Sequence, residues 1–415
     1  MNNKTVLIIT QLYPPLNKTG ALRAAFFSKY LPLFGWQPLI LTSALEHVVE
    51  CVDYDMLHGL PEEEQIFRVP NTEEDIEYDH ISRIKRFNRK LFYPILTYHN
   101  KFTKNMIAQL ESITQAYRIN TIFATSGPPA THYIGSRAHK NWGIPWIADF
   151  RDILEQFIPD KFHDRWYLKR LIREQHSLVS SASELITVSH SLADQLENKL
   201  GRHITVIPNG FDDEMMPPIK NQTFPSFTLT YTGSIWDPRH RNPIPLFQAL
   251  DMAIQKNFIN QKDLEIRFIG TESEMVKAWQ NQFLCGNKIK LLPRIPYKKC
   301  LREQKESCIL IHLSHGKQEG ILTGKLFEYL GARRPIISIP GDNNEVDSLL
   351  HKTGAGVACR DVGSIIQNVC KWYKEWCKNK KVSYYGIEVE ILKFSRKEQT
   401  RKLADILDKL PSANC

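Results

Sequence analysis

The chain of 415 residues lacks the patterns that define several common classes of protein. None of its 8 cysteines forms a C-x-x-C pair, which argues against zinc knuckles and thioredoxin-type redox motifs. No run approaches the roughly 18 apolar residues of a membrane-spanning helix. The apolar run Val6–Ile9 near the N-terminus is too short for a signal peptide. We therefore expect a cytoplasmic protein with free thiols.

Two phosphate-binding fingerprints are also missing. The dinucleotide pattern G-x-G-x-x-G does not follow the first expected strand. The run Gly320 to Leu326 resembles a P-loop, but its glycine spacing is one residue short and Leu326 replaces the Ser/Thr that binds magnesium. No group of His, Cys and Asp has zinc-ligand spacing. We expect neither a metal nor a bound cofactor.

The composition is that of a folded, mildly basic protein. Hydrophobic residues make up 42% and charged residues 24%, which is enough apolar material for a core. Lys+Arg 54 against Asp+Glu 45 gives a net charge of +9, which suits anionic ligands or anionic lipid. Nucleic acid is not an expected partner, because no RNA-binding module or basic arm is present. The length predicts two or three domains.

Short apolar runs alternate with helical patterns along most of the chain. Strands that read as continuous apolar runs are typical of parallel sheets covered by helices on both faces. The sequence therefore predicts an α/β fold with two doubly wound, Rossmann-like parallel sheets. The expected strands are Val6–Thr10, Leu39–Thr42, Ile122–Thr125, Trp146–Phe150, Leu185–Val188, Ile204–Ile207, Phe227–Thr232, Leu264–Ile269, Ile289–Leu292, Ile309–Leu313, Ile336–Ile339 and Gly356–Ala358.

A polar, proline-rich stretch after Pro208 separates the two halves. We predict an N-terminal domain at 1–212, a C-terminal domain at 213–385 and a helical segment at 386–415, most of which reads as one long basic helix. Ligands of open α/β sheets bind at the carboxyl ends of the strands. We therefore expect the functional residues at those ends, facing a cleft between the domains.

In the first half, polar residues follow three of the expected strands. Gly20 and Arg23 lie where the first strand leads into a helix, whose N-terminus favours negative charge. Charged residues at the end of an apolar strand need partners or a ligand, because burying them alone is costly. The alternatives are an ordinary loop and an internal Arg–Asp network. The other candidates here are Ser126, His132, Asp149, Arg151 and Asp152.

In the second half, Gly233 ends a strand, and Arg239 and Arg241 follow in the loop. Arginine pairs with phosphate in two-pronged geometry, so these two residues suit a diphosphate; the alternative is a pair of solvated loop arginines.

The last group of candidates surrounds the start of a helix after Ile309–Leu313 and comprises Glu319, Gly324, Lys325 and Glu328. Lys325 can neutralise phosphate, and the carboxylate of Glu328 can accept hydrogen bonds from two hydroxyls such as those of a ribose. The alternative for Glu328 is an exposed position on the helix.

Together these segments resemble the family 4 glycosyltransferases of the GT-B fold, in a bacterial surface-polysaccharide branch. The resemblance rests on a Tyr-Pro-Pro loop at 13–15, Thr-Ser-x-Pro-Pro at 125–129, Asp-Phe-Arg-Asp at 149–152 and Thr-Gly-Lys-x-Phe-Glu-Tyr-Leu at 323–330. It implies an N-terminal acceptor domain, a C-terminal domain for a nucleotide-diphosphate sugar, and transfer with retention of configuration without a bound metal.

The resemblance also implies roles for single residues. Gly20 matches the loop glycine near the donor phosphate, and Arg239 falls where the family has a phosphate-binding lysine. Ser234 stands where a partner arginine is usual, so Lys325 or Arg241 substitutes for it. Glu328 matches the second Glu of a Glu-x7-Glu pair. Glu319 lies one residue before the position of the first.

The remaining roles follow from the same resemblance. The acceptor side comprises Arg23, Ser126, His132, Arg151 and Asp152, and the catalytic candidates are Arg239, Lys325, Glu319 and Asp149.

Two basic stretches with interleaved aromatics, 81–104 and 165–173, suit the surface of an anionic membrane, where a lipid-linked saccharide acceptor would be found. The alternative is a solvated basic helix face over the core. Two other functions stay open. A nucleotide-sugar epimerase of similar fold would release a free nucleotide sugar, and a non-catalytic binding partner would bind donor without turnover.

Overall fold

The computed structural model describes residues 4–44, 52–70, 101–126, 130–154, 162–218, 223–235, 241–271, 274–315 and 320–411. Within them the chain forms two compact units. The first contains residues up to Pro208 together with the C-terminal segment from Arg396, and the second contains Asn209–Ser395. The sequence prediction placed the boundary at 212/213 and set 386–415 apart as a separate segment. In the structure, the C-terminal segment from Arg396 belongs to the first unit.

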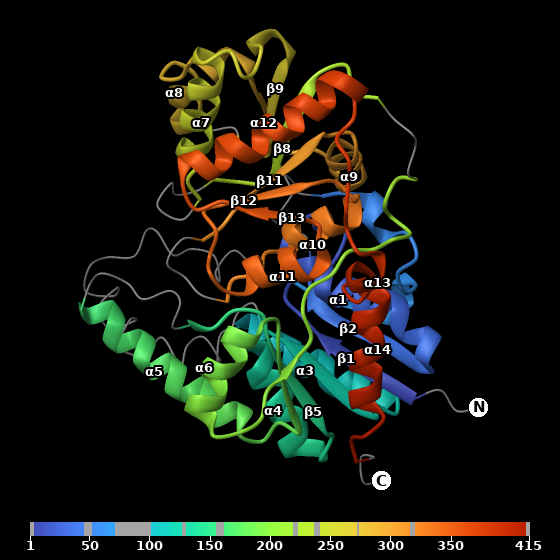
Figure 1. Ribbon diagram of the computed structural model, residues 1–415. Coiled ribbons are helices and arrows are strands. Elements are labelled where there is room, and N and C mark those ends of the chain that lie inside the picture. The colour runs from blue at the N-terminus through green and yellow to red at the C-terminus, as the bar shows by residue number, and fades with distance from the viewer. Residues whose placement is uncertain are drawn as a thin grey trace. The chain divides into compact units, whose positions relative to one another are not determined.

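The first unit is built on a parallel sheet whose strand order is β3-β2-β1-β4-β5-β6-β7. Figure 1 labels β1, β2 and β5 of this sheet. Every residue of β4 and β5 is buried, and so is the carboxyl-terminal part of β1. Continuous apolar runs of this kind are typical of strands that are covered on both faces. The strands are β1 (Lys4–Ile9), β2 (Trp36–Ser43), β3 (Ile66–Val69), β4 (Thr121–Thr125), β5 (Trp146–Phe150), β6 (Glu184–Thr187) and β7 (Thr205–Val206). The helices are α1 (Thr19–Tyr30), α3 (Lys101–Ala116), α4 (Ala130–Trp142), α5 (Phe162–Val179), α6 (His190–Leu200) and α14 (Arg396–Leu407).

The second unit repeats this plan with the strand order β10-β9-β8-β11-β12-β13. Its strands are β8 (Phe227–Thr232), β9 (Leu264–Ile269), β10 (Ile289–Leu292), β11 (Ile309–Leu313), β12 (Ile336–Ile339) and β13 (Gly356–Ala358). Its helices are α7 (Ile244–Gln255), α8 (Glu274–Gln280), α9 (Tyr297–Lys305), α10 (Gly324–Ala332), α11 (Glu345–Thr353), α12 (Val362–Asn379) and α13 (Glu388–Leu392). Figure 1 shows α12 beside α7. The prediction of two doubly wound parallel sheets is confirmed.

Each sheet has a core on both faces, because alternate side chains of a strand point to opposite sides. In β1, Leu7 and Ile9 join one hydrophobic cluster, whereas Val6 and Ile8 join another. The second cluster includes Leu403 of α14, and α14 also lies against α1. The C-terminal helix therefore completes the core of the first unit.

The C-terminal segment corrects one prediction. The expected single helix is broken into α13 and α14, because the intervening backbone pairs with a distant part of the second unit. The N–H of Phe211 donates to the carbonyl of Phe394 at 3.1 Å, and Phe211 forms a parallel bridge with Ser395. A backbone engaged in this way does not continue a helix, so the amphipathic pattern is interrupted there.

The strand order reverses between β1 and β4 in the first unit and between β8 and β11 in the second. At such a switch point the connections leave in opposite directions, and a crevice forms at the carboxyl ends of the two central strands. These two places are where the candidate residues must be sought, each within its own unit.

Candidate functional site

At the switch point of the second unit, the side chain of Lys325 lies against the backbone of Gly233. Gly233 directly follows β8 with a φ of 124°, a backbone conformation that side chains disfavour. A Cβ atom added there would lie 1.9 Å from Cε of Lys325, the second residue of α10. The glycine therefore leaves the space in which the lysine side chain lies at the end of the strand.

Lys325 lies among groups that do not neutralise it. Its ammonium is 5.3 Å from the centre of the Tyr231 ring and 3.5 Å from the Tyr231 hydroxyl. Burial and the nearby charge of Arg241 lower the pKa of Lys325 to about 7, although Glu328 acts in the opposite direction. A lysine in this setting gains its proton most easily when an anion approaches.

Arg241 lies in the loop after β8 and supplies the second cation. Its Nη1 donates to the carbonyl of Ser234 at 2.8 Å. Its Nη2 and Nε both donate to Nε2 of His315, at 2.8 and 3.2 Å. Among the residues that the structure describes, neither Arg241 nor Lys325 forms an ion pair with a carboxylate. Two cations without acidic partners make this strand end a candidate anion site.

Glu328 lies one turn along α10 and is almost fully buried. The hydroxyl of Tyr297 donates to its Oε1 at 3.2 Å, and Nε2 of Gln304 donates to its Oε2 at 3.1 Å. The same amide nitrogen also donates to Oγ1 of Thr232 at 3.1 Å, which ties α9 to the end of β8. A carboxylate held in this way keeps lone pairs on both oxygens for hydroxyl groups of a ligand.

The switch point of the first unit holds a buried ion pair between α1 and β5. Nε and Nη2 of Arg23 donate to the two carboxylate oxygens of Asp149, at 2.9 and 2.8 Å, and both side chains are at most 1% exposed. The hydroxyl of Thr125 donates to Asp149 at 2.6 Å, and Nη1 of Arg23 donates to the carbonyl of Ile207 at 2.9 Å. The guanidinium of Arg23 and the carboxylate of Asp149 therefore neutralise one another.

This pair is the internal Arg–Asp network that the sequence left open, but its arginine comes from α1. The roles expected of Arg23 at the acceptor and of Asp149 in catalysis require an accessible polar atom. In this arrangement neither side chain exposes one, because the two groups are buried and bound to each other.

His132 is also enclosed. It is fully buried, and burial lowers its pKa to about 4, so the ring is neutral near pH 7. Its Nε2 lies 3.1 Å from the carbonyl of Asp149, and its Nδ1 lies 3.2 Å from the amide nitrogen of Gln175. A neutral ring satisfies both contacts if Nε2 carries the proton and Nδ1 accepts. His132 thus binds the backbone of β5, and both of its ring nitrogens are occupied by protein groups, so neither is exposed to an acceptor.

Arg151 connects two of the predicted loops. Its guanidinium donates to the carbonyls of Gly20 and Ser126, at the ends that follow β1 and β4. A Cβ atom on Gly20 would lie 2.9 Å from Nη1 of Arg151, so a side chain at this position would have to displace the guanidinium. Asp152 is exposed. Of the predicted acceptor residues, Arg151 and Asp152 keep accessible atoms, and Ser126 is buried beside them.

The structure therefore sorts the predicted residues into two groups. Gly233, Arg241, Gly324, Lys325 and Glu328 come together in the second unit, around the ends of β8 and the start of α10. The predicted residues of the first half come together at the ends of β1, β4 and β5. Arg239 and Glu319 lie outside the described residues.

Three site residues were not predicted: Tyr297, Gln304 and His315. Tyr297 and Gln304 are seven residues apart on α9 and so share one face of that helix. His315 comes two residues after β11 and could have been found by the strand-end rule that pointed to Arg241.

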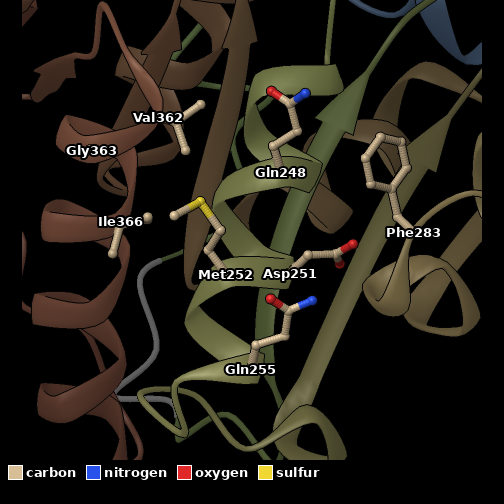
Figure 2. Close-up of a pocket in the computed structure, with 8 residues that line it drawn as sticks. All are labelled: Gln248, Asp251, Met252, Gln255, Phe283, Val362, Gly363 and Ile366. Carbon is tan, nitrogen blue, oxygen red and sulfur yellow. The ribbon is translucent and has the colours of Figure 1, made fainter.

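A separate cavity of about 500 Å³ lies in the second unit between α7 and α12 (Figure 2). Met252, Val362 and Ile366 give it apolar walls, and the carboxylate of Asp251 faces Phe283 across it. Asp251 already accepts the backbone N–H groups of Leu284 and Cys285, at 2.9 and 2.8 Å. None of the predicted site residues lines this cavity.

The described residues contain no cluster of three or more His, Cys, Asp or Glu side chains that could hold a metal ion. No helix within the same described residues has the length and apolar character needed to cross a membrane.

Comparison with known proteins gives one family match over part of the chain and several solved structures with a similar fold. The model of the family described as Glycosyltransferase Family 4 matches residues 47–215. Sucrose-phosphate synthase from Thermosynechococcus elongatus has a similar structure, with a TM-score of 0.65 and 11% identity over 98% of each chain. The Anabaena protein HepE in complex with UDP and glucose aligns with a TM-score of 0.63 and 13% identity, over 98% of this chain and 100% of HepE.

A third similar structure is a putative UDP-N-acetylglucosamine 2-epimerase from Listeria monocytogenes. It has a TM-score of 0.54 and 10% identity, over 97% of this chain and 95% of the epimerase. No curated protein matches the sequence significantly.

Proposed function

We propose that this chain, a glycosyltransferase of GT-B fold whose residues 47–215 match family 4, is a retaining enzyme that transfers a sugar from a nucleoside-diphosphate donor to a saccharide acceptor. The observation that carries the proposal is the pair of cations at the end of β8. Arg241 and Lys325 have no carboxylate partner among the described residues, and Glu328 lies on the same helix as Lys325. The two cations suit a diphosphate, and the carboxylate of Glu328 suits the hydroxyl groups of an attached ribose.

In this proposal the two cations stabilise the leaving group. The bond between C1 of the sugar and the diphosphate oxygen breaks, and a bond from C1 to the acceptor oxygen forms on the same face. The acceptor hydroxyl gives its proton to an oxygen of the departing diphosphate. Arg241 and Lys325 act on the charge that develops on the diphosphate, and Glu328 holds the ribose so that C1 stays in place. No metal or other cofactor takes part in these steps.

Uridine donors are the first to test, because the similar HepE structure contains UDP and glucose. Thermal-shift screening against UDP-, GDP-, dTDP- and ADP-sugars should find one nucleotide class that raises the melting temperature. Glu328→Ala should then weaken binding of that donor, whereas the exposed Glu214→Ala serves as the matched control. If no nucleoside diphosphate or its sugar binds, or if Glu328→Ala binds donor as tightly as Glu214→Ala, the donor assignment is wrong.

Turnover separates the rival functions. Transfer of labelled sugar to an extracted lipid-linked or free saccharide supports the transferase, and the anomeric configuration of the product tests retention. A new free nucleotide sugar made without any acceptor would identify an epimerase. Donor binding without transfer or hydrolysis, across a panel of acceptors, would identify a binding protein.

We also propose that the acceptor is lipid-linked, in the synthesis of cell-surface polysaccharide, and that the enzyme works at the cytoplasmic face of an anionic membrane. The support is an exposed face of α5 that carries Arg165, Trp166, Lys169 and Arg173 within about 100° of the helix circumference. The stretch 81–100 lies outside the described residues. Phe102 is buried in the core, as the alternative interpretation of that stretch requires.

Co-sedimentation with vesicles tests this surface. Binding to anionic but not to neutral vesicles should be weakened by the double change Lys169→Glu and Arg173→Glu. Equal recovery with both kinds of vesicle, or no effect of the double change, would contradict the membrane proposal while leaving the transferase proposal intact.

A further inference from the structure

His315 is the side chain that holds Arg241, and it is an unusual partner for an arginine. An arginine has five N–H donors and no acceptor, so Nε2 of His315 must be the accepting atom in both contacts, at 2.8 and 3.2 Å. The ring is therefore unprotonated at Nε2, with its proton on Nδ1, and carries no charge. The pair Arg241–His315 keeps the full positive charge of the guanidinium.

A carboxylate in place of His315 would hold the arginine equally well but would cancel its charge. This cancellation occurs in the first unit, where Asp149 both orients and neutralises Arg23. A neutral acceptor orients the guanidinium and leaves its charge available to a ligand. A histidine at position 315 can therefore position the guanidinium of Arg241 without compensating its charge.

Among the described residues, the other groups around Arg241 also leave its charge uncompensated. Lys325 of α10 is cationic when protonated, and Tyr231 of β8 stays a neutral phenol because burial raises its pKa. Burial, together with the nearby charges of Lys325 and Arg241, lowers the pKa of His312 on β11 to about 3, so this ring is also neutral. Its Nδ1 is 2.9 Å from the Ser338 hydroxyl.

Nε2 of His312 is buried, and within the described part of the chain it has no hydrogen-bond partner. This is a second observation that points to a ligand, because buried polar atoms normally find partners. Within the described residues, Glu328 is an acid that acts on the cluster through Lys325, and its carboxylate is held by Tyr297 and Gln304.

We propose that His315 is a positioning residue of the donor site, which holds the guanidinium of Arg241 against the end of β8 without neutralising it, so that Arg241 can pair with the diphosphate. The inference rests on the proposed function, since it assumes that the anion bound here is a nucleoside diphosphate. It adds a residue that acts through Arg241 and not by direct contact with the donor.

Three substitutions of His315 test separately whether it must accept a hydrogen bond from Arg241 and whether it must be uncharged. His315→Gln keeps a neutral acceptor near the position of Nε2, His315→Leu removes the acceptor, and His315→Glu keeps an acceptor but cancels the charge. UDP, or the diphosphate of whichever nucleotide the screen selects, is the probe, and its dissociation constant is measured by calorimetry. The exposed His351→Leu on α11 is the matched control.

We expect His315→Gln to bind UDP within about threefold of the unaltered chain. His315→Leu should bind about tenfold more weakly, because a hydrogen bond to a charged group is lost and Arg241 is free to turn away. His315→Glu should bind at least as weakly as the leucine variant, although its acceptor is intact. A structural role alone would rank the glutamate variant with the glutamine variant.

A double-mutant cycle completes the test. In an Arg241→Ala background, His315→Leu should have no further effect on the dissociation constant, because the histidine acts through the arginine. If the unaltered chain binds UDP and all three His315 variants bind it equally, or if the two changes are additive, the positioning role is wrong while the proposed function stands. If the unaltered chain binds no nucleoside diphosphate, the donor assignment itself fails, and the positioning role fails with it.

Discussion

Binding of a nucleoside diphosphate should carry a proton from solvent to Lys325. In the unliganded chain, burial and Arg241 lower the pKa of this lysine to about 7. A bound diphosphate places negative charge beside the ammonium and favours its charged form, so its pKa rises toward the ordinary value of a lysine. At a pH between the two values, binding of the anion and uptake of the proton are one coupled event.

The size of the effect follows from the pKa. At pH 8 only about one-tenth of the Lys325 side chains carry a proton before binding, so each diphosphate bound should take up about 0.9 proton. The phosphate groups themselves, with a second pKa near 6, are already ionised at this pH and release almost none. Above pH 7 the dissociation constant should therefore rise, approaching about tenfold for each further pH unit.

Calorimetry at pH 8 in buffers with different ionisation enthalpies measures this uptake directly, because the observed heat changes with the buffer in proportion to the protons exchanged. Lys325→Arg carries its charge at every accessible pH, and its uptake should fall close to zero. Lys374→Arg, on the exposed face of α12, should behave like the unaltered chain. An uptake below about 0.2 proton in the unaltered chain, or an equal uptake in Lys325→Arg, would refute the reasoning.

Three further outcomes are expected from the same structure. Lys325→Met should raise stability against urea, by about 1 kcal/mol or more, because it removes a buried cation without an acidic partner among the described residues. This gain should be largest below pH 7, where the folded chain must bury the charged lysine, and should shrink as the pH rises toward 10.5. Arg23→Leu should cost about 3–5 kcal/mol in urea unfolding, since Asp149 is left charged and fully buried, and an ordinary two-state curve with an unchanged midpoint would contradict this. Gly135→Ala should lower stability by about 1–3 kcal/mol, because the new Cβ would lie 2.7 Å from the Trp146 ring, and thermal unfolding that shows no loss would mean that the ring can move aside.

Most of the fold could be predicted because the strands are buried on both faces. Trp146–Phe150, Ile309–Leu313 and Ile336–Ile339 are nearly continuous apolar runs that are buried along their whole length, and the structure has strands with those bounds. The strand β3 was missed because Ile66–Val69 is a short edge strand that contains Arg68 and is buried at only its two ends. The break between α13 and α14 was missed for a different reason. It depends on pairing with Phe211, which is remote in the sequence.

The site could be predicted in part from the rule that functional residues follow strands. That rule pointed to Gly233 and Arg241. After β11 it was used only for the residues around the start of α10, so Ser314 and His315, which directly follow the strand, were passed over. Tyr297 and Gln304 could not be found in this way. They lie on α9, and only the packing of α9 against α10 brings them to the carboxylate of Glu328.

The two switch points show why a charge at the end of an apolar strand is ambiguous in a sequence. Arg23 and Arg241 are both loop or first-turn arginines near the end of a central strand, and nothing local distinguishes them. Arg23 is paired by Asp149, which lies 126 residues away, and the pair is sealed from solvent. Arg241 meets His315, 74 residues away, and keeps its charge. The difference between a structural ion pair and an anion site therefore depends on one remote partner. If His315→Glu converts the second arrangement into the first, loss of anion binding should come with a gain in stability, because a buried cation acquires its counter-charge.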